Sequence, residues 1–222
     1  MNNLLYNLQF YFTLCSSAIF FGLYTTLYDF SRNALHNRIQ HSDIKEIYNT
    51  YYKIIPTVSF NVLISNFLFI LSTFNITEYY SYSPEKYYLL LILLKIYIMR
   101  YLTDFFFYSI HRLMHTKYFY KFHKIHHEIK APIGITAFYM HPIDYIFGNL
   151  LPIYLPTLIV QADLITMHIW IILSVGNSVI VSHGGFLDKS EFHDDHHKYF
   201  KYNYGTEMFM DDLFKTKKEL TQ

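Results

Sequence analysis

The sequence predicts an all-α integral membrane protein with about four transmembrane spans, three helices plus a helical hairpin, and a cytosolic histidine-rich helical cap. Three observations support this fold class. Hydrophobic residues form 52% of the chain and aromatic residues 20%, whereas charged residues form only 16%. Several apolar stretches reach the length of about 20 residues that crosses a bilayer. Histidines gather in clusters beyond the ends of those stretches.

The apolar stretches place the helices in order along the chain. The predicted helices cover Leu4–Tyr28, Ile54–Phe74, Tyr88–Ile110, Ile143–Val160 and Leu164–Val181. Only Gln161, Ala162 and Asp163 separate the last two, so these two predict a hairpin that enters the membrane and returns. Pro152 and Pro156 are expected to kink its first arm, because proline removes a backbone donor and clashes with the preceding turn.

Basic residues between the spans predict the topology. The segment from Asp29 to Lys53 contains four Lys or Arg residues, whereas the loop from Asn75 to Lys86 contains one. Five follow the third span, the hairpin tip has none, and six lie in the C-terminal tail. Because Lys and Arg accumulate in cytoplasmic loops, the histidine clusters are all expected on the cytosolic side.

Three histidine clusters have the spacing of an α-helical face, on which residues i, i+3 and i+4 lie together. They are His111 with His115, then His123 with His126 and His127, then His193 with His196 and His197. Neutral imidazole is a ligand for zinc, copper, iron and nickel. Eight clustered histidines exceed the four ligands of one tetrahedral zinc, so the sequence favours two metal ions.

Few other metal ligands lie near these clusters. Cys15, the single cysteine, lies in a distant apolar stretch, which excludes a thiolate zinc finger, a cysteine-ligated iron–sulfur cluster and an internal disulfide. The nearby acids Glu128, Asp194 and Asp195 do not form the Glu-x-x-His pairs of soluble di-iron bundles. The net charge of +1 argues against a nucleic-acid partner. An all-histidine centre for two metals remains.

The order of these motifs resembles that of the fatty acid hydroxylase/sterol desaturase superfamily of membrane di-iron oxygenases. The similarity covers His111 to Gly205, and the C4-methylsterol oxidase branch is most similar in its short motifs. Those motifs are Lys124–Glu128, Ala131–Gly134, Tyr139–Pro142, Ser182–Gly185, Phe192–His197 and Asn203–Gly205. Asp144 stands where relatives often have glutamate, a departure that bears on the substrate.

The resemblance implies nine iron ligands and a reaction type. The implied ligands are His111, His115, His123, His126, His127, His183, His193, His196 and His197. For His183 the alternative is a histidine that only closes a membrane helix beside Gly184 and Gly185. Two iron ions would use O2 to oxidise an unactivated C–H bond of a sterol or fatty acyl lipid. Residues 1–87 would be N-terminal membrane helices, and residues 88–222 the catalytic domain.

Four further residues are candidates for orienting the ligands or the substrate. Asp104 lies two helical turns before His111, although an ion pair with Arg100 is the alternative. Asp194 adjoins a ligand, or faces solvent. Asn177 either lines the site or bridges two helices. His141 precedes a proline and orients a loop or the substrate, if it is not itself a ligand.

The resemblance also implies partners and a location. Electrons from NAD(P)H would arrive through an external carrier, a cytochrome b5 or a ferredoxin with its reductase, because the chain shows no fused electron-carrier segment. The endoplasmic reticulum membrane is the expected location in a eukaryote. Two other classes of protein stay open: a membrane transporter or sensor of zinc or copper, and a metal-dependent membrane hydrolase.

Overall fold

The computed structural model describes residues 3–31, 44–73, 88–129, 132–183 and 190–218, and all regular secondary structure over those residues is helical. The elements in chain order are α1 (Asn3–Asp29), α3 (Ile44–Phe60), η1 (Asn61–Ser65), α4 (Asn66–Thr73), α5 (Tyr88–Met114), α6 (Tyr120–His123), η2 (His126–Glu128), η3 (Gly134–Phe138), α7 (Pro142–Asp144), η4 (Tyr145–Leu150), α8 (Leu151–Ile159), α9 (Leu164–Gly176), η5 (Asn177–Ser182), α10 (Ser190–Tyr199) and α11 (Phe209–Phe214). The all-α prediction is confirmed.

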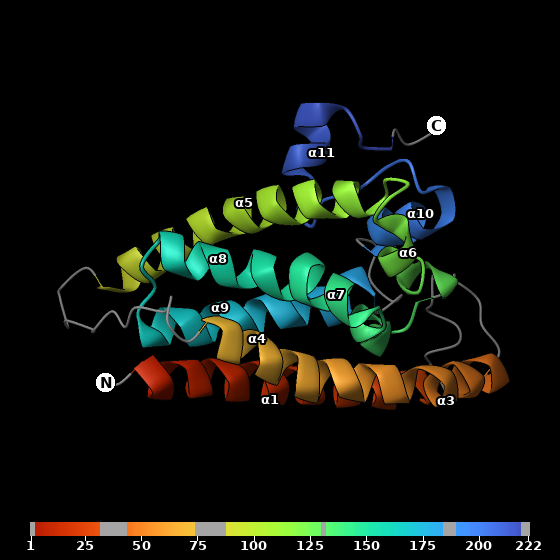
Figure 1. Cartoon of the computed structure of the whole chain (residues 1–222), viewed down its shortest axis with the longest axis horizontal. Coiled ribbons are helices and arrows are strands. Elements are labelled where there is room, and N and C mark those ends of the chain that lie inside the picture. Colours follow the sequence, from red (N-terminus) through yellow and green to blue (C-terminus); the bar gives the residue numbers. More distant parts are fainter. Residues whose placement is uncertain (1–2, 32–43, 74–87, 130–131, 184–189, 219–222) are drawn as a thin grey trace.

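The long helices lie side by side along the longest axis of the molecule (Figure 1). α1 packs against α9, and α5 packs against α8. α3, η1 and α4 follow one another without a break and form a single rod, and α9 continues directly into η5. The predicted hairpin is present, because α8 and α9 are joined by a short turn in which Gln161 has a positive φ of 51°.

Three helices in the described part of the chain are long and apolar enough to cross a membrane: Leu5–Asp29, Lys45–Ser72 and Leu164–Ser182. The second begins nine residues before the predicted start at Ile54. Its first turns carry polar residues that the apolar pattern missed, yet Ile47, Tyr51 and Ile54 are buried against the segment that follows η2. α5, at 27 residues, is about 40 Å long, but it includes Lys95, Arg100 and Asp104.

All histidine-bearing elements of the predicted clusters lie at one end of this bundle. The carboxyl end of α5 meets α6 and α10 there (Figure 1). η5 ends at the same place, since it packs against α10 and η3. A common end is what the loop charges predicted for the clusters. The loops 32–43 and 74–87, which supply part of that charge pattern, lie outside the described residues.

A buried asparagine ties the membrane helices to the segment below the histidines. The amide of Asn61 donates to the carbonyl oxygens of Phe138 and Met140, both at 2.9 Å. Its own carbonyl oxygen accepts a hydrogen bond from Ser65. Asn61 lies in η1, a π-helical turn, and π-turns occur often where a helix serves a functional site.

We predict that Asn61→Ala destabilises the protein by about 1–3 kcal/mol, because two buried carbonyl groups lose their donor. The measurement is thermal unfolding in detergent. Leu63→Ala is the matched control, because Leu63 lies in the same turn but is 46% exposed. Equal unfolding midpoints for the two variants would contradict the anchoring role of Asn61.

Candidate metal centre

Nine histidines form two compact groups of ring nitrogens. The first group contains His111, His115, His123, His127 and His196, and the second contains His126, His183, His193 and His197. Within each group the candidate ligand atoms all lie within 4.8 Å of one another. The structure therefore brings together every histidine that the sequence motifs nominated as a ligand.

Each HxxHH motif contributes to both groups. On α10, His193 and His197 join the second group, whereas His196 joins the first. Adjacent residues on an α-helix are rotated by about 100°, so His196 and His197 diverge to different centres while His193 and His197 share a face. The prediction that each cluster presents one ligating face is wrong in this respect.

The middle cluster is also not a single helix. α6 ends at His123, and His126 and His127 belong to the 3₁₀ turn η2. The rings still converge, since the Nε2 atoms of His123 and His127 are 3.0 Å apart. His126 faces the other way, and its Nε2 lies 3.2 Å from that of His197.

Hydrogen bonds on the outer side of the rings identify the tautomers in the first group. Nδ1 of His111 lies 2.7 Å from the carbonyl oxygen of Tyr204, and Nδ1 of His196 lies 2.7 Å from that of Tyr202. A carbonyl oxygen can only accept, so each Nδ1 carries the proton. The Nε2 atoms then present lone pairs to the centre of the group.

His123 is held by a carboxylate instead of a carbonyl. Its Nδ1 lies 2.7 Å from Oδ2 of Asp144, and its Nε2 lies 3.1 Å from the Nε2 of His111. Two lone pairs at this separation repel each other unless a cation lies between them. The donor set of the first group therefore fits a bound metal ion.

The second group shows the same arrangement. Nδ1 of His183 lies 2.8 Å from the carbonyl oxygen of Ser178, which leaves its Nε2 buried without a hydrogen-bond partner. Nδ1 of His126 faces the carbonyl oxygen of Tyr139 at 3.3 Å. An orphaned buried nitrogen beside three other imidazoles fits a second metal ion.

Burial keeps these imidazoles in the form that binds metals. Removal from water lowers the pKa of His115 to about 2, with a smaller contribution from the neighbouring His196. Burial also lowers the pKa of His196 to about 3. Both rings are therefore neutral at physiological pH, and their lone pairs are available without competition from protons.

The C-terminal segment supplies the carbonyl oxygens of Tyr202 and Tyr204, which accept from the rings of His196 and His111. Two aspartates hold that segment in place. Asp104 accepts hydrogen bonds from the backbone N–H groups of Thr206, Glu207 and Met210 at 2.7–2.9 Å. Asp211 accepts from the N–H of Tyr204 at 2.9 Å and from that of Gly205 at 2.6 Å.

Gly205 is required by the close approach of these carboxylates. A Cβ atom at this position would lie 2.5 Å from Oδ1 of Asp104 and 2.9 Å from Oδ2 of Asp211. Those distances are well below van der Waals contact. The glycine therefore lets both carboxylates reach the backbone that presents Tyr204 to His111.

Asp104 thus binds the backbone of the segment that presents Tyr204 to His111, and it influences the histidine only through that segment. Its alternative, an ion pair with Arg100, is not formed, because Arg100 pairs with Glu207. The carboxylate that does touch a ligand is Asp144, which the sequence reasoning did not nominate as an orienting residue. The available signal was an acid at the start of an apolar stretch, three residues after His141.

The other candidate residues have different positions. His141 accepts a hydrogen bond from the N–H of Ile143 at 3.1 Å and caps α7, and it lies in neither histidine group. Asp194 is buried on α10 beside His193. Asn177 begins the π-turn η5 and lines a cavity next to the second group.

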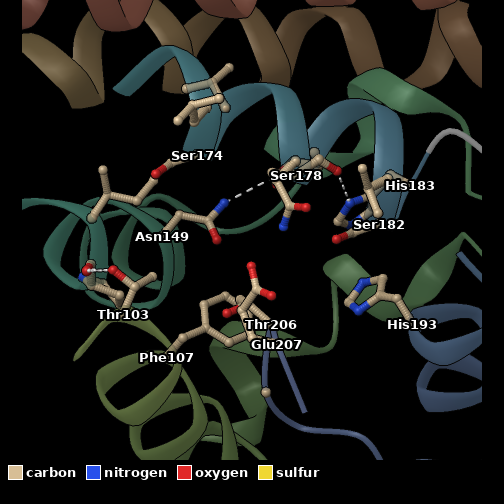
Figure 2. Close-up of a pocket in the computed structure, with 18 of the residues that line it drawn as sticks. Thr103, Phe107, Asn149, Ser174, Ser178, Ser182, His183, His193, Thr206 and Glu207 are labelled. Carbon is tan, nitrogen blue, oxygen red and sulfur yellow. Dashed lines mark hydrogen bonds between the residues drawn. The ribbon is translucent and has the colours of Figure 1, made fainter. Parts of the chain in front are cut away.

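This cavity has a volume of about 430 Å³ and runs between α5, η4, α8, α9 and η5. Figure 2 shows His183 and His193 at one end of it, with Ser174 and Ser178 on one wall. Its apolar lining includes Phe138, Leu150, Pro152, Ile153, Trp170, Leu173 and Val175. His126 also lines the cavity, whereas no member of the first group does.

Known proteins resemble this chain over the part that builds the site. Fatty acid hydroxylase domain-containing protein 2 of Homo sapiens is 39% identical over 129 residues, covering 56% of this chain and 38% of that protein. Fatty acid hydroxylase ahd1 of Mycosarcoma maydis is 33% identical over 180 residues, covering 76% and 46%. Methylsterol monooxygenase 2-1 of Arabidopsis thaliana is 34% identical over 145 residues, covering 53% of each.

The chain thus spans between 38% and 53% of the length of these relatives. No solved structure matches significantly. The fatty acid hydroxylase family matches residues 96–216, which is more than half of the chain and includes all nine clustered histidines. The chain belongs to the fatty acid hydroxylase family.

Proposed function

We propose that this protein is a membrane di-iron oxygenase that hydroxylates an unactivated C–H bond of a lipid. The observation that carries the proposal is the pair of histidine groups, one of which forms the end wall of a mostly apolar cavity. Family membership favours iron among the metals that imidazole binds.

The overall reaction balances as RH + O2 + 2 electrons + 2 protons giving ROH + H2O. One oxygen atom enters the C–H bond, and the other leaves as water. A bound iron pair supplies the oxygen activation and C–H oxidation, for which side chains have no equivalent. The chain's own contribution is to hold the metals, position the lipid and exclude water.

The histidines would hold the metals through Nε2, and acceptors on the outer side fix five of the nine rings: His111, His123, His126, His183 and His196. Asp144 orients His123, and the carbonyl oxygens of Tyr204 and Ser178 orient His111 and His183. Such outer contacts set both the tautomer and the ring angle of a ligand. The ligands are thus arranged before a metal binds.

The cavity would position the substrate. Its apolar walls suit a hydrocarbon body, and the histidine end places one carbon of that body beside the second group. Burial of the lipid there would also exclude bulk water from the reacting carbon. The substrate would be a fatty acyl lipid or a sterol such as a C4-methylsterol, since the relatives include a fatty acid hydroxylase and a methylsterol monooxygenase.

The remaining parts of the proposal concern organisation. Residues 88–222 would form the catalytic domain, and residues 1–87 would add membrane helices. The histidine end would face the cytosol of the endoplasmic reticulum in a eukaryote, where an external carrier of the cytochrome b5 or ferredoxin type would deliver electrons from NAD(P)H. In the described residues the clustered ligands gather at one end of the bundle, which is unlike a transport path distributed along the spans.

We predict that the purified protein retains about two iron ions per chain, one for each histidine group. His196→Ala removes a ligand of the first group, and His126→Ala removes a ligand of the second. Each variant should bind less metal, and its hydroxylation rate should fall at least a hundredfold, because the reaction uses both ions. Elemental analysis and mass spectrometry of lipids supplied with isotope-labelled O2 measure these effects.

Tightly bound zinc without consumption of O2 would overturn the oxygenase assignment. Retention of iron and activity in both variants would instead show that the ligand set is wrong. His168→Ala is the control, because His168 lies on α9 outside both groups, where its Nδ1 contacts Thr13.

We predict that Asp144→Leu weakens iron binding by about 10–100-fold, because His123 loses the acceptor that fixes its ring. Asp144→Asn keeps an acceptor oxygen and should weaken binding less. Competition with a chelator measures the affinities. Asp163→Asn is a matched control at a buried aspartate that caps α9 in the hairpin turn. If it reduced iron affinity as much as Asp144→Leu does, the orienting role of Asp144 would be untenable.

A further inference from the structure

The cavity beside the second histidine group carries polar side chains as well as apolar ones. Ile96 and Ile153 pack with Trp170, which precedes His183 by about 20 Å along α9 and η5. Several polar lining residues lie nearer the histidines: Asn149, Asn177, Ser178, Ser182, Thr206 and Glu207. A lipid in this cavity therefore meets polar groups close to the second histidine group.

Two of the polar lining residues have hydrogen-bonding capacity that the described residues leave unused. The hydroxyl of Ser174 is buried in the cavity wall and has no partner in the described part of the chain. The amide nitrogen of Asn149 donates to the carbonyl oxygen of Ala137 at 3.0 Å, and its side-chain oxygen points into the cavity (Figure 2). Because buried polar groups normally have partners, these atoms indicate a ligand that has a polar group of its own.

Glu207 places a carboxylate on the wall opposite the serines (Figure 2). Its backbone N–H donates to Asp104 at 2.8 Å, so the aspartate that holds the C-terminal segment also positions Glu207. Arg100 of α5 donates from Nε to Oε1 of Glu207 at 3.2 Å, and from a second nitrogen to Oε2. The side chain of Glu207 is 21% exposed and that of Arg100 is 45% exposed, so the carboxylate is the more buried partner.

The ion pair defines which ligand group Glu207 can bind. An ionised carboxylate only accepts hydrogen bonds, and each of its oxygens has two lone pairs. Each oxygen of Glu207 accepts from Arg100 and keeps a further lone pair for a second donor. Glu207 also neutralises the charge of Arg100, which removes an attraction for anionic groups. The fitting partner is a neutral donor such as a hydroxyl.

We propose that Glu207 accepts a hydrogen bond from a hydroxyl group of the lipid and thereby determines which carbon reaches the second histidine group. The inference rests on the proposed function, because it concerns the carbon that is oxidised. That carbon lies near the hydroxyl, at the polar end of the lipid, and the hydrocarbon body extends toward Trp170. Sterols and long-chain alcohols share this chemistry.

Two other ways of filling the cavity fit less well. A free fatty acid would bring its carboxylate close to that of Glu207, and like charges placed together repel. A lipid that enters with its methyl end toward the histidines would displace water from Glu207 and Asn149 without replacing the lost hydrogen bonds.

The test measures binding by the iron-loaded full chain in lipid nanodiscs without O2. The probes are hexadecan-1-ol and cholestanol, each compared with its methyl ether, which cannot donate a hydrogen bond. At least one alcohol should bind the wild type about tenfold more tightly than its ether, because hydrogen bonds to charged groups are strong. Glu207→Leu should bring that ratio close to one. Glu207→Gln, which keeps a neutral acceptor, should retain part of the preference.

Asp212→Asn is the matched control, because Asp212 forms an ion pair with Lys217 in the same C-terminal segment but does not line the cavity. The control should keep the wild-type ratio, and all variants should keep both irons. Equal binding of alcohol and ether by the wild type would overturn the proposal, as would an equal loss of preference in Asp212→Asn and Glu207→Leu. Loss of iron in Glu207→Gln would also count against it, because Glu207 would then act through the fold. Tighter binding of hexadecanoate than of hexadecan-1-ol would assign the site to a carboxylate instead.

Product analysis distinguishes failure of this proposal from failure of the proposed function. With dithionite and isotope-labelled O2, the alcohol that binds should take up the label within a few carbons of its hydroxyl. Label at the far end of the hydrocarbon would overturn the proposal while the oxygenase assignment stands. A wild type that prefers the alcohol but forms no labelled product would count against the oxygenase assignment and support hydroxyl recognition alone.

Discussion

The arrangement of the two histidine groups depends on the direction in which the lone pairs of the imidazole rings point. Several imidazoles face one another through Nε2 at about 3 Å. For His111 and His123, whose Nδ1 atoms both face acceptors, this arrangement is repulsive without a cation between the rings. Acceptors on the outer side hold protons on Nδ1 of five rings: His111, His123, His126, His183 and His196. Folding thus orders the site ahead of the metal, and much of the surrounding chain serves to place those acceptors.

The acceptors explain features that lie far from the metals. The carbonyl oxygen of Tyr204 is presented by a segment that Asp104 and Asp211 bind through backbone N–H groups, and Gly205 permits their approach. The carbonyl oxygen of Tyr139 lies between Phe138 and Met140, whose own carbonyls accept from Asn61. Buried polar residues in the apolar bundle therefore act on the histidine groups through the backbone.

The sequence predicted the helices and the gathering of the histidines well, because apolar length and helical spacing are properties of nearby residues. It did not predict that His196 and His197 belong to different groups. The spacing i, i+3 and i+4 is compatible with one shared group as well as with two. Nor did the sequence identify the contact between His123 and Asp144, which are 21 residues apart. Carbonyl acceptors such as that of Tyr204 leave no trace in the side-chain sequence, so only the three-dimensional structure reveals them.

The two groups of histidines have different surroundings, and this difference suggests a division of labour between them. The apolar cavity touches the second group, through His126, His183 and His193. The exposed ring of Phe200 touches the first group, through His127. A substrate and an electron carrier would therefore approach from different sides. Because His126 and His127 are consecutive residues of η2, one short turn links the two groups, so a shift of this turn would move a ring in each.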